Sequence, residues 1–146
     1  MAIYHTILHP TDFDEISLEA FRVARSLAQL MGAKLTAFHV ASPPAELKED
    51  GRVSLDATDP TTVDLWTDYR TAATDTPEVT VQYSVVITKG DTIDFLKPLV
   101  GDDPKGVLIV MGSLGRTGLR RMIWGNSAED VVRTVPCSVL VVKKPY

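Results

Sequence analysis

Residues 106–127 read GVLIVMGSLGRTGLRRMIWGNS, a wholly apolar run that continues into a glycine-rich segment. The apolar run at 106–111 predicts a strand, and a strand without polar alternation is expected where helices cover both faces of a sheet. The glycine-rich segment from Gly112 to Gly125 is 14 residues long. Connections from a strand to a helix usually have about 2–6 residues, and long ordered ones are often functional. This segment is therefore the first candidate for a functional site.

Short apolar runs and amphipathic stretches alternate along the rest of the chain. Apolar side chains recur every three or four residues over 14–31, which predicts a helix, and Gly32 suits its C-cap. Residues 41–62 hold three prolines and seven charged residues but no aromatic residue, so we expect a mobile surface loop there. We expect further helices at 63–73, 91–100 and 126–135, and further strands at 3–9, 34–40, 78–88 and 138–142.

The alternation of strands with helices indicates an α/β fold, with a parallel sheet and helices on both faces. The chain of 146 residues is expected to be one domain, 1–146. Its net charge of −4 lacks the basic excess of nucleic-acid-binding proteins, so we expect no nucleic-acid partner. The single cysteine, Cys137, excludes a disulfide framework within the chain. No apolar run approaches the ~18 residues of a membrane span and no signal peptide is evident, so we expect no membrane partner and a cytoplasmic protein.

The glycine-rich segment has the chemistry of an anion site at the edge of such a sheet, where ligands of open α/β folds bind. Its glycines allow close approach of the backbone, and the helix expected after it offers an N-terminus that attracts phosphate. Arginine suits phosphate as well, in a chain that is otherwise acidic. The residues concerned are the glycines Gly112, Gly115, Gly118 and Gly125, the arginines Arg116, Arg120 and Arg121, and Asn126 and Ser127 at the start of the helix.

Structural interpretations of the same residues stay open beside the functional ones. Asn126 and Glu129 have the spacing of a capping box, and glycines can simply turn the chain. Asp12 is either a ligand contact or, with Glu15 three residues on, the cap of the first helix. Metal ligands normally cluster, whereas the histidines are dispersed, so we expect histidines of the core or surface and no metal site. These histidines are His5, His9 and His39, and we expect Trp66 and Tyr69 to be core anchors.

The spacing Gly112-x-x-Gly115, nine further residues and then Gly125 with a small polar residue resembles a known motif. It is similar to the G-2x-G-9x-G-[ST] nucleotide loop of the ATP-binding universal stress proteins. The resemblance extends over nearly the whole chain. It includes residues 7–12 (ILHPTD), 36–40 (TAFHV), 90–91 (GD), 107–112 (VLIVMG) and 136–142 (PCSVLVV).

This resemblance implies a Rossmann-like fold of the adenine nucleotide alpha-hydrolase type, with a five-stranded parallel sheet in the order 3-2-1-4-5. It implies a site for ATP, with AMP or ADP as alternatives and Mg²⁺ as companion, at the switch between strands 1 and 4. The implied function is a nucleotide-dependent stress-response or signalling module with at most slow ATP hydrolysis or autophosphorylation. The candidate phosphate acceptors are Ser113, Thr117 and Ser127, and the implied homodimer forms through the last strand, Val139, Leu140, Val141 and Val142.

The resemblance also assigns individual residues to the parts of a bound nucleotide. Pro10, Thr11 and Asp12 line the nucleoside side, Val40 packs on the adenine, and Met111 and Gly112 flank the ribose and α-phosphate. The phosphates are held by Gly115, Gly125, Asn126 and Ser127, with Arg116 as a source of positive charge.

Two residues depart from the family pattern. Asn126 stands where the motif has serine or threonine, although its amide can donate a hydrogen bond and Ser127 follows. Asp14 stands where serine is common; a carboxylate caps a helix well but repels a triphosphate unless Mg²⁺ lies between them. The alternative function is a nucleotide-independent dimeric interaction scaffold of the same fold. Asn126 and Asp14 argue mildly for this alternative, whereas the retained glycines of the loop argue against it.

Flavodoxin-like and receiver domains share the five-strand order, but their key residues do not match. A flavin domain needs a phosphate loop rich in glycine, serine and threonine after its first strand, where residues 10–13 read PTDF. A receiver needs an acceptor aspartate at the end of its third strand, where residues 88–90 read TKG.

Overall fold

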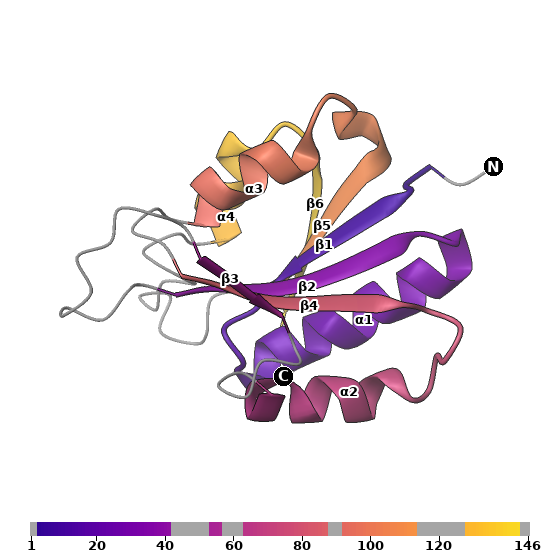
Figure 1. The fold of residues 1–146 in the computed structure, drawn as a ribbon. Helices are drawn as coiled ribbons and strands as arrows, with labels where there is room; N and C mark the ends of the chain where they lie inside the picture. The colour runs from indigo at the N-terminus through magenta and orange to yellow at the C-terminus, as the bar shows by residue number, and fades with distance from the viewer. Residues whose placement is uncertain (1–2, 42–52, 57–62, 88–91, 114–127, 144–146) are drawn as a thin grey trace, which may run out of the picture.

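The computed structural model describes residues 3–41, 53–56, 63–87, 92–113 and 128–143. Its elements follow the expected alternation of strands and helices, with one additional strand (Figure 1). The strands are β1 (Thr6–Pro10), β2 (Lys34–Ala41), β3 (Val53–Asp56), β4 (Val81–Ile87), β5 (Val107–Gly112) and β6 (Ser138–Val142). The helices are α1 (Glu15–Met31), α2 (Thr67–Ala73), α3 (Thr92–Val100) and α4 (Ala128–Thr134), with 3-10 turns η1 (Val63–Trp66) and η2 (Pro104–Gly106).

The sheet has six strands in the order β3-β4-β2-β1-β5-β6. Five of them pair in parallel, and counted along the chain these five stand in the order 3-2-1-4-5, which confirms the expected fold class. From β1 the chain first builds the sheet outward through β2 and β4, and it then returns to add β5 and β6 on the other side of β1. The boundary between β1 and β5 is therefore the topological switch point of the sheet.

Strand β3 corrects the expectation that residues 41–62 form only a loop. Val53–Asp56 pairs antiparallel with β4, and its two ends lie opposite Ile87 and Ser84. Four residues are too few for a strand pattern to stand out among prolines and charges, whereas the open edge of β4 offers backbone hydrogen-bonding groups to any extended segment. The remainder of that range after Ala41 lies outside the described residues.

Two helices cover each face of the sheet, α1 and α2 on one and α3 and α4 on the other (Figure 1). Trp66 and Tyr69 are buried against the α1 face, which confirms them as core anchors. The core on that face includes Ile7, Ala20, Phe21, Ala24, Leu35, Ala37, Val85 and Val110. The core on the α3 face includes Leu8, Phe38, Val40, Val86, Leu96, Ile109, Met111 and Val131.

Helix α1 buries the apolar stripe that its sequence predicted. Ala20, Phe21 and Ala24 are fully buried against the sheet. The helix ends at Gly32, which adopts the left-handed conformation with φ of 65° and donates its N–H to the carbonyl of Ala28. A residue without Cβ adopts this conformation without a steric penalty, so the expected C-cap is confirmed.

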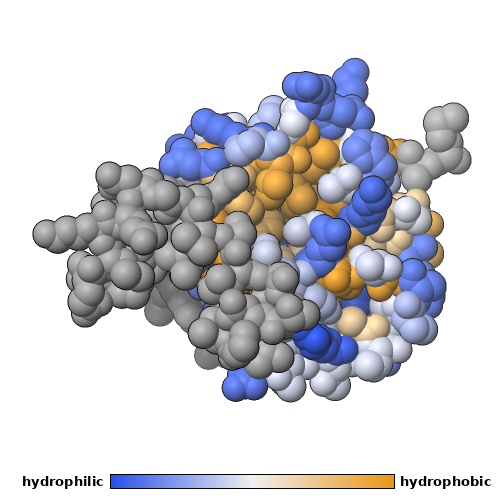
Figure 2. Space-filling view, in the orientation of Figure 1, coloured by the Kyte–Doolittle hydropathy of each residue, from blue (hydrophilic) through white to orange (hydrophobic). Residues whose placement is uncertain are grey.

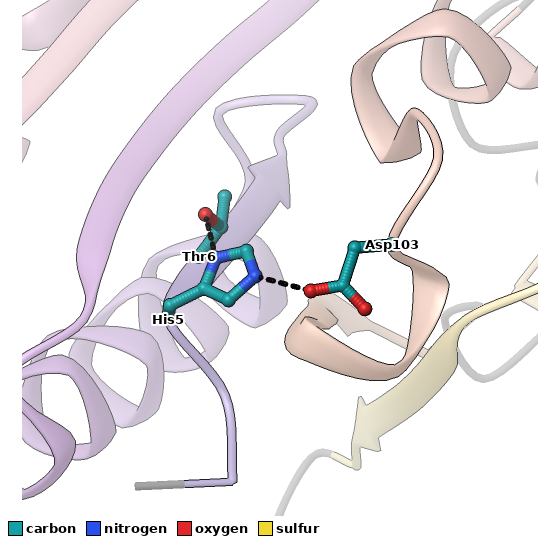
Figure 3. Close-up of polar contacts among 3 residues, drawn as sticks. All are labelled: His5, Thr6 and Asp103. Atoms are coloured by element: carbon teal, nitrogen blue, oxygen red, sulfur yellow. Dashed lines mark hydrogen bonds and ion pairs between the residues drawn. The ribbon is translucent and has the colours of Figure 1, made fainter.

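Figure 3 shows a polar contact at the amino end of the sheet, away from the switch-point edge. His5 donates from Nε2 to the Asp103 carboxylate at 2.9 Å, and its Nδ1 lies 2.8 Å from the Thr6 hydroxyl (Figure 3). The backbone N–H of His5 also donates to the carbonyl of Gly106 at 2.9 Å. These contacts connect the start of β1 to η2, but His5 and Asp103 are exposed, so their ion pair adds little stability.

The surface of α3 is not uniformly polar. Figure 2 shows an apolar area beside this helix, bordered by hydrophilic side chains. Within α3, Leu96 is fully buried whereas Leu99 remains 40% exposed. Among the described residues, no helix has both the length and the apolar character that a membrane span needs.

Candidate functional site

Four of the expected site residues lie together at the carboxyl edge of the sheet. Pro10 ends β1, Val40 is the penultimate residue of β2, and Met111 and Gly112 end β5. Because β1 pairs in parallel with both β2 and β5, the carboxyl ends of these strands meet at one edge. All four residues are buried. They form an apolar floor at the switch point.

The chain leaves β1 in a turn whose polar groups are held by side chains from distant elements. Thr11 is fully buried, and its N–H donates to the carbonyl of Phe38 at 2.9 Å. The Thr11 hydroxyl forms a hydrogen bond with the Tyr69 hydroxyl and accepts the N–H of Phe13 at 2.9 Å. The Thr11 carbonyl accepts a hydrogen bond from His39 Nδ1 at 2.6 Å. All the polar groups of Thr11 are thus engaged within the protein.

Two carboxylates follow Thr11 and have different roles. Asp14 Oδ1 accepts the N–H of Ser17 at 2.8 Å, so Asp14 is the N-cap of α1 and the interpretation of Asp12 as the cap is wrong. Asp12 is half-buried, and its N–H donates to Ser17 Oγ at 3.2 Å. Of the two acidic residues in the turn, Asp14 caps the helix and Asp12 does not.

Phe13 is the strained residue of this turn. Its φ of 64° lies in the left-handed region, which is unfavourable for a residue with a Cβ. The Phe13 ring packs against three others, with centroid distances of 4.8 Å to Trp66, 5.0 Å to His39 and 5.8 Å to Tyr69. Strain of this kind persists where surrounding contacts over-determine the conformation, and it is often found at functional sites.

Burial and nearby carboxylates affect the pKa of the Tyr69 phenol. Burial raises the pKa of Tyr69 well above its ordinary value, the hydrogen bond with Thr11 opposes this, and the carboxylates of Asp14 and Asp12 raise the pKa further. Tyr69 therefore keeps its proton at all physiological pH values. Its hydroxyl is a neutral hydrogen-bonding partner for the turn and not a base.

His9 belongs to the core, as expected. The ring is fully buried, and Nδ1 donates to the carbonyl of Val110 at 2.8 Å. Burial lowers the pKa of His9 to about 4, although the hydrogen bond with Val110 raises it. His9 Nε2 has no hydrogen-bond partner among the described residues. In the described ranges no three histidine, cysteine or acidic side chains gather as a metal site needs.

Gly112 has a packing role at the switch point that its sequence motif does not reveal. A Cβ at this position would lie 2.6 Å from Ile16 Cγ2 and 3.1 Å from the Ile16 carbonyl carbon. The absence of a side chain lets the first turn of α1 approach the end of β5. This close approach brings the Asp12 turn and the start of the glycine-rich segment to the same edge.

Most of the glycine-rich segment, residues 114–127, lies outside the described residues. The expected phosphate contacts Gly115, Arg116, Gly125, Asn126 and Ser127 belong to this part. The described chain enters the segment at Ser113, whose N–H donates to the Val142 carbonyl at 2.8 Å, and resumes in α4. The segment therefore begins at the carboxyl edge where the other site residues lie.

Sequence reasoning missed the side chains that hold the turn. Tyr69 was expected only as a core anchor, and His39 only as a core or surface histidine. Tyr69 is 58 residues from Thr11, and no local pattern connects them. The left-handed Phe13 was equally hidden, since the usual signals for that conformation are glycine, asparagine and aspartate.

Comparison with known proteins identifies this fold and sequence pattern. The model of the family described as "Universal stress protein family" matches residues 3–143. The chain is 31% identical over 158 aligned positions to Universal stress protein MJ0531 of Methanocaldococcus jannaschii, covering 98% of this chain and 84% of that protein.

Solved structures share the fold along the full length of the chain. A universal stress protein crystallised in complex with cAMP has a TM-score of 0.69 and 22% identity, and covers 99% of this chain and 100% of its own. The universal stress protein from Archaeoglobus fulgidus in complex with dAMP has a TM-score of 0.57 and 17% identity, and covers 97% and 99%. The family match over 3–143, together with the strand order and the switch-point edge, shows that this chain belongs to the universal stress protein family.

Proposed function

We propose that this chain binds an adenine nucleotide at the carboxyl edge of the sheet, between β1 and β5. The observation that carries the proposal is the switch in strand order, because it brings the Asp12 turn and the start of the glycine-rich segment to one edge. Ligands of open α/β sheets bind at such an edge. Two structures of the same fold contain cAMP and dAMP, which supports an adenine nucleotide as the ligand class.

The nucleoside end of the ligand is proposed to lie on the turn and the apolar floor. The Asp12 carboxylate is an acceptor that suits the ribose hydroxyls, which are donors. Pro10, Val40 and Met111 supply buried apolar surface near the adenine, as small-molecule sites usually do around a few polar groups. Thr11 contributes through the turn that it holds, since its own hydroxyl is already engaged.

The phosphate end is proposed to lie on the glycine-rich segment, through Gly115, Arg116, Gly125, Asn126 and Ser127. Glycine backbone amides, an arginine and a helix N-terminus are the groups that bind phosphate in proteins. Asp14 places negative charge near the triphosphate of ATP, and a Mg²⁺ ion between the two offsets the repulsion. We therefore expect ATP binding to depend more strongly on Mg²⁺ than AMP binding does.

The biological role that follows is a nucleotide-dependent stress-response or signalling module in the cytoplasm, with at most slow ATP hydrolysis or autophosphorylation. The same proposal includes a homodimer through β6. This strand lies at the end of the sheet order, with Leu140 38% exposed and the neighbouring Val132 of α4 52% exposed. An uncovered apolar edge strand favours pairing with a second copy.

The proposal is tested by acid extraction of the purified protein and by titration calorimetry with AMP and MgATP. We expect an adenine nucleotide in the extract or a binding isotherm for the stripped protein. Asp12→Asn should weaken both ligands by about ten- to hundredfold, the value of a hydrogen bond to a charged group. Glu15→Gln, which removes an exposed carboxylate three residues away, is the matched control. An empty extract and no binding heat would instead favour the nucleotide-independent scaffold.

A further inference from the structure

The turn that carries Asp12 is held by two side chains that the nucleotide does not need to touch, Tyr69 of α2 and His39 of β2. We propose that these are positioning residues: their hydrogen bonds to Thr11 fix the turn so that the Asp12 carboxylate meets the nucleoside. This inference rests on the proposed nucleotide site and names the groups that determine its affinity.

Thr11 is the residue through which both side chains hold the turn. Its hydroxyl pairs with the Tyr69 hydroxyl and also accepts the N–H of Phe13 at 2.9 Å, and its carbonyl accepts from His39 Nδ1 at 2.6 Å. Asp12 lies between Thr11 and Phe13, and its own N–H donates to Ser17 Oγ at 3.2 Å. Tyr69 and His39 therefore fix the backbone before Asp12 from outside the turn. The Phe13 N–H, on the other side of Asp12, is bound to the Thr11 hydroxyl that Tyr69 holds.

Phe13, on the other side of Asp12, has a strained backbone. A φ of 64° at a residue with a Cβ is unfavourable in isolation, so an unsupported turn relaxes to other conformations. The rings of Trp66, His39 and Tyr69 surround Phe13 at centroid distances of 4.8 to 5.8 Å and oppose that relaxation. Tyr69 and His39 thus act twice, through a hydrogen bond to Thr11 and through a ring contact with Phe13.

Tyr69 neither reaches a ligand at the edge nor serves only to fill space in the core. Tyr69 is only 2% exposed and its hydroxyl is bound to Thr11, so a ligand at the edge does not reach it. A phenylalanine would fill the same space in the core, and the hydroxyl is what distinguishes tyrosine there. Other polar atoms of the same aromatic cluster, Trp66 Nε1 and His9 Nε2, lack partners among the described residues. The hydroxyl of Tyr69 is instead committed to the turn.

The test uses the full chain with variants that remove single hydrogen bonds. Tyr69→Phe removes the hydroxyl and keeps the ring, and Tyr83→Phe is the matched control from the same ring cluster. His39→Leu removes the donor to Thr11, whereas His39→Asn retains an N–H donor close to the position of Nδ1. Titration calorimetry measures the Kd for AMP and for MgATP at a temperature where every variant is folded by circular dichroism.

We expect Tyr69→Phe and His39→Leu to raise the Kd about three- to tenfold, by the same factor for AMP and MgATP because both share the nucleoside. Tyr83→Phe should change the Kd less than about twofold. His39→Asn should bind more tightly than His39→Leu, because it restores the hydrogen bond to Thr11 although not the ring contact with Phe13. Amide hydrogen exchange of Phe13 in the ligand-free protein should accelerate in Tyr69→Phe and not in Tyr83→Phe, a readout that a general loss of packing does not reproduce.

Two failures are distinguishable. If the wild-type protein binds nucleotide and Tyr69→Phe and His39→Leu bind it equally well, the positioning role is overturned and the proposed function stands. If the wild-type protein binds neither AMP nor MgATP, the proposed function is overturned and the positioning role with it.

Discussion

Acidification should destabilise this protein through His9, which is buried without charge beneath the switch-point edge. The folded protein takes up a proton on His9 only near pH 4, because burial lowers the pKa from its ordinary value of 6.5 to about 4. The unfolded chain takes up that proton near pH 6.5. Above about pH 6.5 His9 is neutral in both the folded and the unfolded state. In this range His9 therefore contributes nothing to the pH dependence of the free energy of unfolding.

Between about pH 6.5 and pH 4 only the unfolded state binds the proton, so the free energy of unfolding falls as the pH falls. Each pH unit in this window costs about 1.4 kcal/mol, and the whole window costs about 3 kcal/mol. That is a large share of the ~5–15 kcal/mol by which a typical domain is stable. Below about pH 4 both states are protonated at His9 and the loss from this group levels off.

Urea unfolding followed by circular dichroism, repeated between about pH 7 and pH 4, measures this loss. His9→Asn removes the titrating ring and keeps an N–H donor toward the Val110 carbonyl. The difference in unfolding free energy between wild type and His9→Asn cancels the contribution of every other group. The free energy of unfolding of the wild type, relative to that of His9→Asn, should fall by about 3 kcal/mol on acidification from pH 7 to pH 4.

The control is His5→Asn, which removes an exposed histidine next to the same strand. It should keep the loss of stability that His9 causes between pH 7 and pH 4, because His9 remains in place. A difference between wild type and His9→Asn that stays constant over this range would refute the reasoning, since His9 would then not be buried in its neutral form.

Three further predictions concern packing and assembly. Gly112→Ala should lower the free energy of unfolding by about 1–3 kcal/mol in urea denaturation, because the new Cβ meets the Ile16 backbone, which cannot give way; unchanged stability would show that α1 does not pack this closely. Gly106→Ala should cost less than about 1 kcal/mol in the same assay, although its Cβ would meet the His5 ring, because an exposed side chain can move; a loss equal to that of Gly112→Ala would contradict this. Leu140→Lys should convert a dimer of the wild-type protein to a monomer in light scattering, whereas a wild-type mass that is monomeric at all concentrations would reject the β6 interface.

Much of the fold could be predicted because its signals are local. The apolar run ending at Met111, the stripe of α1 and the cap glycine Gly32 each lie within one element, and the structure confirms them. The strand order came from the family resemblance rather than from periodicity. β3 was missed because four residues give too short a pattern, and its position depends on the open edge of β4.

The sequence could predict some residues of the candidate site and not others. The family resemblance assigns Pro10, Val40, Met111 and Gly112 to the site, and the structure brings them to one edge of the sheet. Two capping residues were open for α1, Asp12 and Asp14, and only the geometry decides for Asp14.

What holds the turn could not be predicted, because it depends on contacts between residues far apart in sequence. Thr11 and Tyr69 meet across 58 positions, and Thr11 and His39 across 28. The second, packing role of Gly112 against Ile16 is likewise a property of the folded chain alone.

The central claim is that the carboxyl edge between β1 and β5 binds an adenine nucleotide. The most direct measurement is a crystal structure of the full chain grown with saturating AMP. We expect the nucleoside at this edge, with the Asp12 carboxylate hydrogen-bonded to the ribose and the base against Val40. A well-ordered edge with no ligand under these conditions, or a nucleotide bound elsewhere on the protein, would contradict it.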